Sequence, residues 1–408
     1  MTPRSPLVAS LFANRLLAGL IAGMAVLVAL ANAWLLASRH HVTQRGITDF
    51  QDFYVAGRLA LQGRPECAYA WSCLRQAQLE EFGRWEYMPW AYPPQFTALV
   101  SGLAILPHAP AFLLFVLGTF ALFCLAIVKL AGRYAAFPLV LGLPSILINL
   151  RCGQNGFLTA GLIGLFAWLH LKRDARGGLA LGAMVIKPHL AVASALLVLG
   201  RRRWRVAGWA ALVVLGSTVA ATLLLGPGIW PAFRLGSATS GVLLWHGEFP
   251  IERMTSVFAT AYRFGAPPAV ALALHLGVAL AALGGLAHLA RVCGNERVVL
   301  AATTAATVLV SPYNYDYDLT ILAVALALIA PVIVERMTGW EALLLGLLSW
   351  LSAANFAIMA VALNSIAGIW HHKQIWSISS LCILTMIARV IRVVRRGQAI
   401  EPIGAGVG

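Results

Sequence analysis

The chain has 408 residues, of which 60% are apolar and 11% charged, and its mean hydropathy is +0.81. Soluble domains carry about 25% charged residues, so this composition excludes a water-soluble globular protein. Disorder is excluded as well, because it needs low hydrophobicity. The net charge of +15 would suit a nucleic-acid partner, but in a membrane protein it is typical of basic cytoplasmic loops. The sequence therefore predicts a single all-α, polytopic membrane domain over residues 1–408 that binds no nucleic acid.

Long uncharged runs mark the membrane-spanning helices. The first run, 14–38, has only Arg15 at its start and no small-residue cleavage site, so we expect a retained helix and not a signal peptide. Because a helix needs about 20 apolar residues to cross a bilayer, the chain predicts about 11–13 crossings. The later runs lie at 111–128, 134–150, 152–171, 206–233, 266–290, 298–315 and 342–372, with a last helix near 374–394.

The polar segment 39–93 is expected to be a periplasmic loop. It carries six arginines and six acids, whereas the other loops are short and rich in Lys and Arg, which keeps such loops in the cytoplasm. Two helices along the membrane surface are expected in it, over 49–62 and 72–82, with Ser72 as the N-cap of the second. Cys67 and Cys73 also lie there, and they form either a disulfide, in an oxidising compartment, or two free thiols.

Whether the segments 94–107 and 177–200 cross the membrane stays open at this point. If every apolar run crosses, the basic clusters at 129–133 and 172–176 fall outside, against the rule for short basic loops. A half-helix hairpin over 177–200, broken at Lys187–Pro188, would keep both of its ends in the cytoplasm. We expect 94–394 to form the transmembrane bundle and 395–408 to be a cytoplasmic tail.

Two polar clusters near the outer boundary are candidates for chemistry. In "TDFQDFY", Asp49 has the position of a general base that accepts a proton from an incoming hydroxyl. The alternative is a capping pair, with Asp49 at the N-cap and Asp52 in the first helical turn. In "WAYPP", Tyr92 precedes two prolines, which is typical either of a simple helix start or of an interfacial aromatic belt.

Two further clusters interrupt apolar sequence. Residues 149–156, "NLRCGQNG", are either a plain loop or a site where Gln154 and Asn155 bind sugar hydroxyls. Lys187 is followed by Pro188 and His189, and these two side chains, Lys187 and His189, are the only ionisable groups between Arg176 and Arg201. A buried lysine either loses its proton or meets an anion, and a lipid phosphate is the natural anion in a membrane.

The last cluster, "SPYNYDYD" at 311–318, lies between two apolar runs. On a helix, Asn314 and Asp318 would share one face, and Tyr313 and Tyr317 another. The cluster is either an interfacial aromatic belt or part of a functional site that includes Tyr315, Asp316 and Asp318.

In this order, the motifs resemble the bacterial members of glycosyltransferase family 87, polytopic enzymes of the GT-C fold that use polyprenyl-phosphate sugars. The resemblance runs from about residue 46 to residue 330, and no motif matches after about residue 335. The matching stretches are "TDFQDFYVAGRLALQG", "YPPQFTALVSGLAILP", "GQNGFLTAGLIG", "VIKPHLAVASALLVLGRRRW", "MTSVFATAYRFGAP" and "SPYNYDYDLTILA".

The resemblance implies transfer of a hexose, most often mannose, from a polyprenyl-phosphate donor to a lipid or glycan acceptor on the periplasmic side of the bacterial inner membrane. It implies neither a cofactor nor a metal. It makes Asp49 the catalytic base, and Lys187, Arg151 and His189 contacts of the donor phosphate. Two departures from the family pattern, Arg151–Cys152 before the third motif and His189 in place of a frequent Gln, bear on sugar or acceptor preference. The supporting or acceptor-binding residues are Asp52, Tyr54, Tyr92, Gln154, Asn155, Tyr315, Asp316 and Asp318.

A single displacement follows from these roles. Asp49 would remove the acceptor's proton while the oxygen attacks the anomeric carbon opposite the phosphate, which inverts that carbon, and Lys187 would stabilise the leaving phosphate. A transporter or flippase of lipid-linked sugars is the main alternative, but its paired broken helices in two related halves are not found. A scaffold protein is the third, and a buried Lys187 argues against it.

Overall fold

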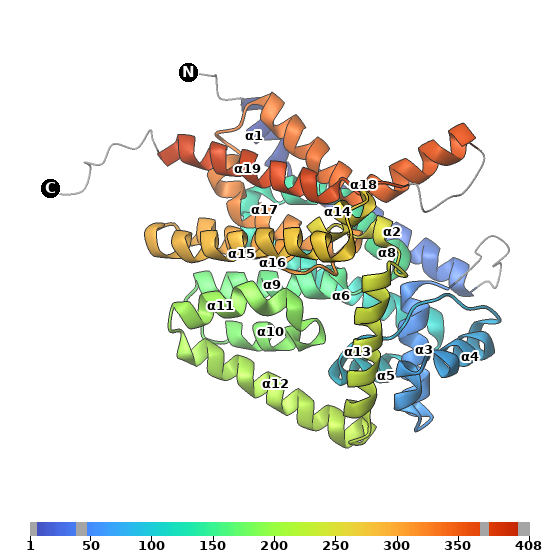
Figure 1. The fold of residues 1–408 in the computed structure, drawn as a ribbon. Helices are drawn as coiled ribbons and strands as arrows, with labels where there is room; N and C mark the ends of the chain where they lie inside the picture. The colour runs from blue at the N-terminus through green and yellow to red at the C-terminus, as the bar shows by residue number, and fades with distance from the viewer. Residues whose placement is uncertain (1–5, 38–46, 368–374, 399–408) are drawn as a thin grey trace. The chain divides into compact units, whose positions relative to one another are not determined.

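The structure, a computed structural model, describes residues 6–37, 47–367 and 375–398 (Figure 1). It is 82% helical, and the described residues form no strand, only an isolated bridge between Met254 and Tyr315. The chain divides into two compact units, and α2, α6 and α8 contribute residues to both. Unit 1 comprises Met1–Ala22, Ala126–Ser145 and Ile251–Gly408, and unit 2 comprises Gly23–Leu125 and Ile146–Pro250.

Unit 2 contains the predicted outer loop and the broken hairpin. Its helices are α2 (Arg15–Ala37), α3 (Asp49–Leu61), α4 (Trp71–Phe82), α5 (Pro94–Leu103), α6 (His108–Ala131), α8 (Leu143–Cys152), α9 (Gly156–Leu171), α10 (Gly177–Ala183), α11 (Val192–Gly200), α12 (Trp204–Leu225) and α13 (Ile229–His246). Short 3-10 turns lie between them, η1 (Pro65–Tyr69), η3 (Met184–Ile186) and η4 (Pro188–Ala191).

Unit 1 contains the carboxyl-terminal helices. They are α14 (Val257–Arg263), α15 (Pro268–Val292), α16 (Glu296–Val310), α17 (Thr320–Ile333), α18 (Gly339–Ala367) and α19 (Ser379–Gln398), with α1 (Pro6–Phe12) and α7 (Ala136–Leu141). The turns η2 (Gly132–Tyr134), η5 (Ile251–Arg253) and η6 (Asp316–Leu319) complete this unit. The core helix is α17, of whose 14 residues 12 are buried.

Six helices among the described residues are long and apolar enough to cross a membrane. They are Arg15–Ala37, His108–Tyr134, Trp204–Leu225, Pro268–Val292, Asp316–Ile333 and Gly339–Ala362. Four further helices of the described residues are also apolar but shorter, Leu143–Cys152, Gly156–Leu171, Gly177–Ile186 and Pro188–Gly200. The predicted all-α polytopic architecture is confirmed, and the total of about 11–13 crossings stays a prediction.

Several predicted boundaries were wrong. The run 206–233 is two helices, because α12 ends at Leu225 and α13 begins at Ile229. Gly226, directly after α12, has a φ of +81°, a backbone conformation that favours glycine. The run 298–315 is helical only to Val310. The last helix begins at Ser379 and continues to Gln398, past the predicted start of the tail, and residues 399–408 lie outside the described part of the chain.

The two loop helices lie close to their predicted ranges, but their caps differ. Thr48, and not Asp49, is the N-cap of α3, where it forms a capping box with Gln51, so that Asp49 and Asp52 both lie in the first turn. Ser72 is not the N-cap of α4, because the helix begins at Trp71 after Ala70. Nine of the 13 residues of α3 are buried, so this helix is a packed element and not an exposed surface helix.

The predicted break in the hairpin is present. Lys187 has a non-helical backbone, with φ −142° and ψ 73°, and separates η3 from η4. On the amino-terminal side, α10 packs closely against α12, where a Cβ at Gly178 or Gly182 would overlap the backbone carbonyls of Val206 and Ala210. The hairpin is therefore held against α12 while the chain at Lys187 leaves the helical path.

Candidate active site

The carboxylate of Asp49 lies in a hydrogen-bonded network within unit 2. Gln154 donates from Nε2 to Asp49 Oδ1 over 2.9 Å. The other carboxamide atom, Oε1, accepts from the hydroxyl of Tyr92 at 3.0 Å and from the backbone N–H of Asn155 at 2.8 Å. Because a backbone N–H can only donate, it fixes the orientation of the carboxamide and makes Nε2 the atom that faces Asp49.

The turn between α8 and α9 is shaped to approach α3. Gly153 has φ +66°, and a Cβ on it would lie 2.5 Å from the Cβ of Phe50. Only glycine tolerates both the left-handed backbone and this close approach. The turn thereby brings Gln154 against the start of α3, where Asp49 lies.

Lys187 is joined to the same network through Tyr92. Its side chain is only 7% exposed, and its Nζ lies 5.9 Å from the centroid of the Tyr92 ring. An ammonium over an aromatic face is stabilised by the ring quadrupole. A buried cation and Asp49 are therefore connected by two intervening side chains, along the chain of contacts Asp49–Gln154–Tyr92–Lys187.

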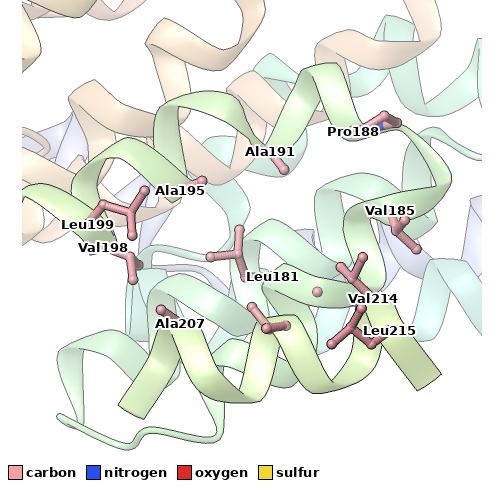
Figure 2. A pocket seen from close by; sticks show the side chains of 13 residues that line it. Leu181, Val185, Pro188, Ala191, Ala195, Val198, Leu199, Ala207, Val214 and Leu215 are labelled. Atoms are coloured by element: carbon pink, nitrogen blue, oxygen red, sulfur yellow. The ribbon is translucent and has the colours of Figure 1, made fainter. Parts of the chain in front are cut away.

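An apolar pocket of about 500 Å³ lies beside the break at Lys187 (Figure 2). Thirteen residues of α10, α11, α12 and the turns between α10 and α11 line it, and every one is apolar. Val185 and Pro188, on either side of the Ile186–Lys187 pair, form part of the wall. A wall of this composition offers hydrocarbon contacts alone.

Asp52 lies in a different environment from Asp49. It is 5% exposed, and Gln78 of α4 donates to its Oδ1 over 2.8 Å. Gln78 is itself fixed, since its Oε1 accepts from the backbone N–H of Glu86. Burial raises the pKa of Asp52 to about 8, with the Gln78 hydrogen bond opposing and the charge of Asp49 adding to the shift. Asp52 is therefore a largely protonated carboxyl at neutral pH.

Some predicted residues of unit 2 lie apart from this network. The hydroxyl of Tyr54 donates to the carbonyl of Leu106 over 3.1 Å, which ties α3 to the turn between α5 and α6. Arg151 is exposed at the end of α8, and His189 is half-buried in η4. Asn155, in contrast, is fully buried directly after Gln154.

The predicted residues of unit 1 form a second cluster. Arg253 donates to both oxygens of Asp316, from Nε over 3.0 Å and from Nη2 over 2.9 Å. Tyr315 donates its backbone N–H to Asp318 Oδ2, which closes the turn η6. The predicted helical faces were wrong, because residues 311–315 are not helical and Asn314 donates to the carbonyl of Val308. Within unit 1, Asp316 therefore joins η6 to Arg253 of η5, and Asp318 closes the turn η6.

Sequence reasoning missed Gln78 and Arg253, the partners of two predicted acids. Gln78 had no signal beyond its place in a short helix of the outer loop. Arg253 directly precedes the motif "MTSVFATAYRFGAP", and its charge opposite to that of the acids in 316–318 was the available signal.

The predicted cysteine pair is bonded in the structure. Cys67 and Cys73 form a disulfide with a Cα–Cα distance of 5.4 Å, and Arg64 Nη2 lies 3.4 and 3.3 Å from the two sulfurs. The bond ties η1 to the first turn of α4 in the outer loop. No group of three or more potential metal ligands is found in the described part of the chain.

Comparison with known proteins gives one match. The sequence model of the family described as glycosyltransferase family 87 matches residues 90–312, which is more than half of the chain. The match covers Tyr92, Gln154 and Lys187, whereas Asp49 and Asp316 lie outside it. No curated protein and no solved structure matches the chain. On the strength of this match, the chain belongs to glycosyltransferase family 87 and is a membrane glycosyltransferase.

Proposed function

We propose that this protein transfers a hexose, with mannose as the first candidate, from a polyprenyl-phosphate sugar to a lipid or glycan acceptor at the periplasmic face of the bacterial inner membrane. The observation that carries the proposal is the connected set of a half-buried carboxylate, Asp49, and a buried ammonium, Lys187, bridged by Gln154 and Tyr92. A base and a cation in one polar site are the two groups that a phosphate-leaving glycosyl transfer needs.

The mechanism we propose is a single displacement. Asp49 takes the proton of the acceptor hydroxyl while that oxygen bonds to the anomeric carbon, and the bond from this carbon to the phosphate oxygen breaks on the opposite face. The anomeric carbon is inverted, and polyprenyl phosphate leaves with the bonding electron pair. The hydrogen bond that Gln154 donates to Oδ1 orients the Asp49 carboxylate that receives the proton.

Lys187 stabilises the negative charge on the departing phosphate. An ammonium removed from water acts strongly on such a charge, and its burial supports this role. The apolar pocket beside it supports a donor that carries a long hydrocarbon chain, because its wall offers hydrocarbon contacts alone.

The test is transfer by the purified protein in lipid nanodiscs, with radiolabelled polyprenyl-phosphate mannose and a membrane glycolipid extract. We expect label in the acceptor with the wild type, and a loss of about 10²–10⁴-fold with Asp49→Asn, because the variant lacks the general base. Donor binding and membrane insertion should persist. Asp174→Asn is the matched control, since Asp174 pairs with Arg176 at the surface.

Two results would overturn the proposal. Wild-type turnover of Asp49→Asn would remove Asp49 from the mechanism. Recovery of label in the starting lipid alone, across several hexoses and acceptor extracts, would contradict the proposed donor.

A further inference from the structure

Asn155 is a buried polar side chain that the fold does not pair. It is 0% exposed, and among the described residues neither its Oδ1 nor its Nδ2 has a hydrogen-bond partner. It has the N-cap position of α9, yet its side chain makes no capping hydrogen bond. Burying a carboxamide without partners costs free energy, so such a group in a native protein calls for a partner that the fold itself does not supply.

A second asparagine at the same turn shows what a structural role looks like. Asn149 is also 0% exposed, but its Oδ1 accepts the backbone N–H of Gly156 over 3.0 Å, which ties the end of α8 to the start of α9. The two side chains have the same chemistry and the same burial. They differ in that the fold uses the carboxamide oxygen of Asn149 and leaves that of Asn155 unused.

Asn155 also lies next to the reacting carboxylate. Its backbone N–H donates to Gln154 Oε1, and the same carboxamide donates to Asp49. The side chain of Gln154 therefore links the backbone of Asn155 to the proposed base, Asp49.

We propose that Asn155 binds hydroxyl groups of the hexose that is transferred, an inference that rests on the proposed function. A carboxamide presents two N–H donors and one oxygen acceptor. A phosphate has acceptors alone and would leave Oδ1 unpaired, and a hydrocarbon chain would satisfy neither atom. Sugar hydroxyls both donate and accept, so a hexose satisfies Oδ1 and Nδ2 together.

The consequence is discrimination at the sugar. A site built to hydrogen-bond a hydroxyl disfavours an analogue without it, because the buried group is then left unpaired. Asn155 thus makes the protein prefer a sugar-bearing lipid phosphate to the bare lipid phosphate.

The experiment compares Asn155→Leu with Asn149→Leu, since leucine has a similar volume and no polar atom. Binding of two probes is measured in nanodiscs, polyprenyl-phosphate mannose and polyprenyl phosphate without sugar, together with the Tm of the ligand-free protein. For Asn155→Leu we expect the affinity for the mannosyl lipid to fall about tenfold to a hundredfold, unchanged affinity for the bare lipid, and an equal or higher Tm. Asn149→Leu should lower the Tm, because it removes the hydrogen bond that the Gly156 N–H donates to Asn149 Oδ1.

The outcomes separate this inference from the proposed function. If Asn155→Leu binds both lipids as the wild type does, Asn155 contacts only a resident water or nothing, and the inference is overturned even where the wild type transfers mannose. If the wild type transfers no sugar, but its preference for the mannosyl lipid depends on Asn155, the proposed function fails and the sugar site stands. Asn155→Ala removes the same hydrogen bonds and replaces the leucine variant if that one does not fold.

Discussion

At the scale of single residues, Asp49 and Asp52 are two acids in one helical turn with different surroundings. Asp49 is half-buried beside Gln154, whereas Asp52 is buried between α3 and α4 against Gln78. Burial disfavours the charged carboxylate, which raises the pKa of Asp52 to about 8. In the mechanism that we propose, Asp49 is the proton acceptor, whereas Asp52 is a neutral structural carboxyl.

This pKa sets a pH dependence of stability with a definite sign. Below the ordinary aspartate pKa of 3.8 both the folded and the unfolded states bind the proton, and between 3.8 and about 8 only the folded state keeps it. The stabilisation is therefore complete at low pH and is lost as the pH rises through about 8.

We expect Asp52→Asn to flatten the pH dependence of the Tm across this window. The carboxamide of this variant can accept from Gln78 as the protonated acid does, and it never ionises, so the Tm above pH 8 should exceed that of the wild type by a few degrees. Thermal unfolding in nanodiscs from about pH 5 to about pH 9 measures it. Glu80→Gln, at an exposed acid of α4, should leave the profile unchanged. A steeper profile for Asp52→Asn would contradict the assignment.

Sequence reasoning located the residues that carry unusual chemistry and missed their partners. Asp49, Gln154 and Lys187 were singled out because polar groups are costly in apolar sequence. Gln78 could not be found in this way, because a glutamine in a polar loop helix is ordinary. Its importance comes from the hydrogen bond that it donates to Asp52 of the neighbouring helix, and no local sequence pattern predicts which residues two helices bring together.

At the scale of elements, the approach of α3 to the α8–α9 turn depends on one glycine. Gly153 combines a positive φ with near-contact to Phe50, the residue that follows Asp49. A side chain at this position must push the start of α3 away from Gln154.

We expect Gly153→Ala to lower both the Tm and the transfer rate, the rate by about tenfold or more, because a small displacement of a reacting group is costly. Gly63→Ala is the control, since Gly63 also has a positive φ of +73° but nothing within 4 Å of an added Cβ. Transfer assays on both variants separate the backbone cost, common to the two, from the displacement. Equal activities would show that the contact at Phe50 is unimportant.

Most elements could be predicted, and the failures have identifiable causes. The helices α3 and α4 were predicted closely from the helical spacing of their apolar residues, although the predicted N-caps were wrong. The division of 206–233 into α12 and α13 was missed, although Gly226, Pro227 and Gly228 form a turn signal, because the apolar run around them was weighted more heavily. The segment 311–315 was wrongly treated as helical for a similar reason.

At the scale of the whole molecule, the membrane class was predictable from composition alone and the number of crossings was not. Among the described residues, six helices are both long and apolar enough to cross, whereas α8, α9, α10 and α11 have only 7 to 16 residues. The direction of these short helices depends on packing rather than on length. The predicted sidedness, with the basic loops in the cytoplasm and the segment 39–93 outside, therefore rests on charge alone.

Cysteine labelling tests this sidedness in intact cells. We expect Glu80→Cys, in α4 of the outer loop, to react with an impermeant maleimide, and Lys172→Cys, at the end of α9, to react only after permeabilisation. Both positions are exposed, so the difference reports the compartment and not burial. Labelling of Lys172→Cys from outside would reverse the assignment of the basic loops.

The apolar pocket beside Lys187 has a consequence for how such a protein selects its partners. A wall of aliphatic side chains offers no hydrogen bond, so it distinguishes ligands only by their thickness and flexibility. One methylene group changes the binding free energy in such a pocket by roughly 1–3 kcal/mol. Branching or saturation of a bound hydrocarbon chain would change the affinity only slightly, and the head group of the lipid would not contact this wall. If the pocket holds the hydrocarbon chain of the donor, as we propose, the polar side chains around Asp49 and not this wall select the group that is transferred.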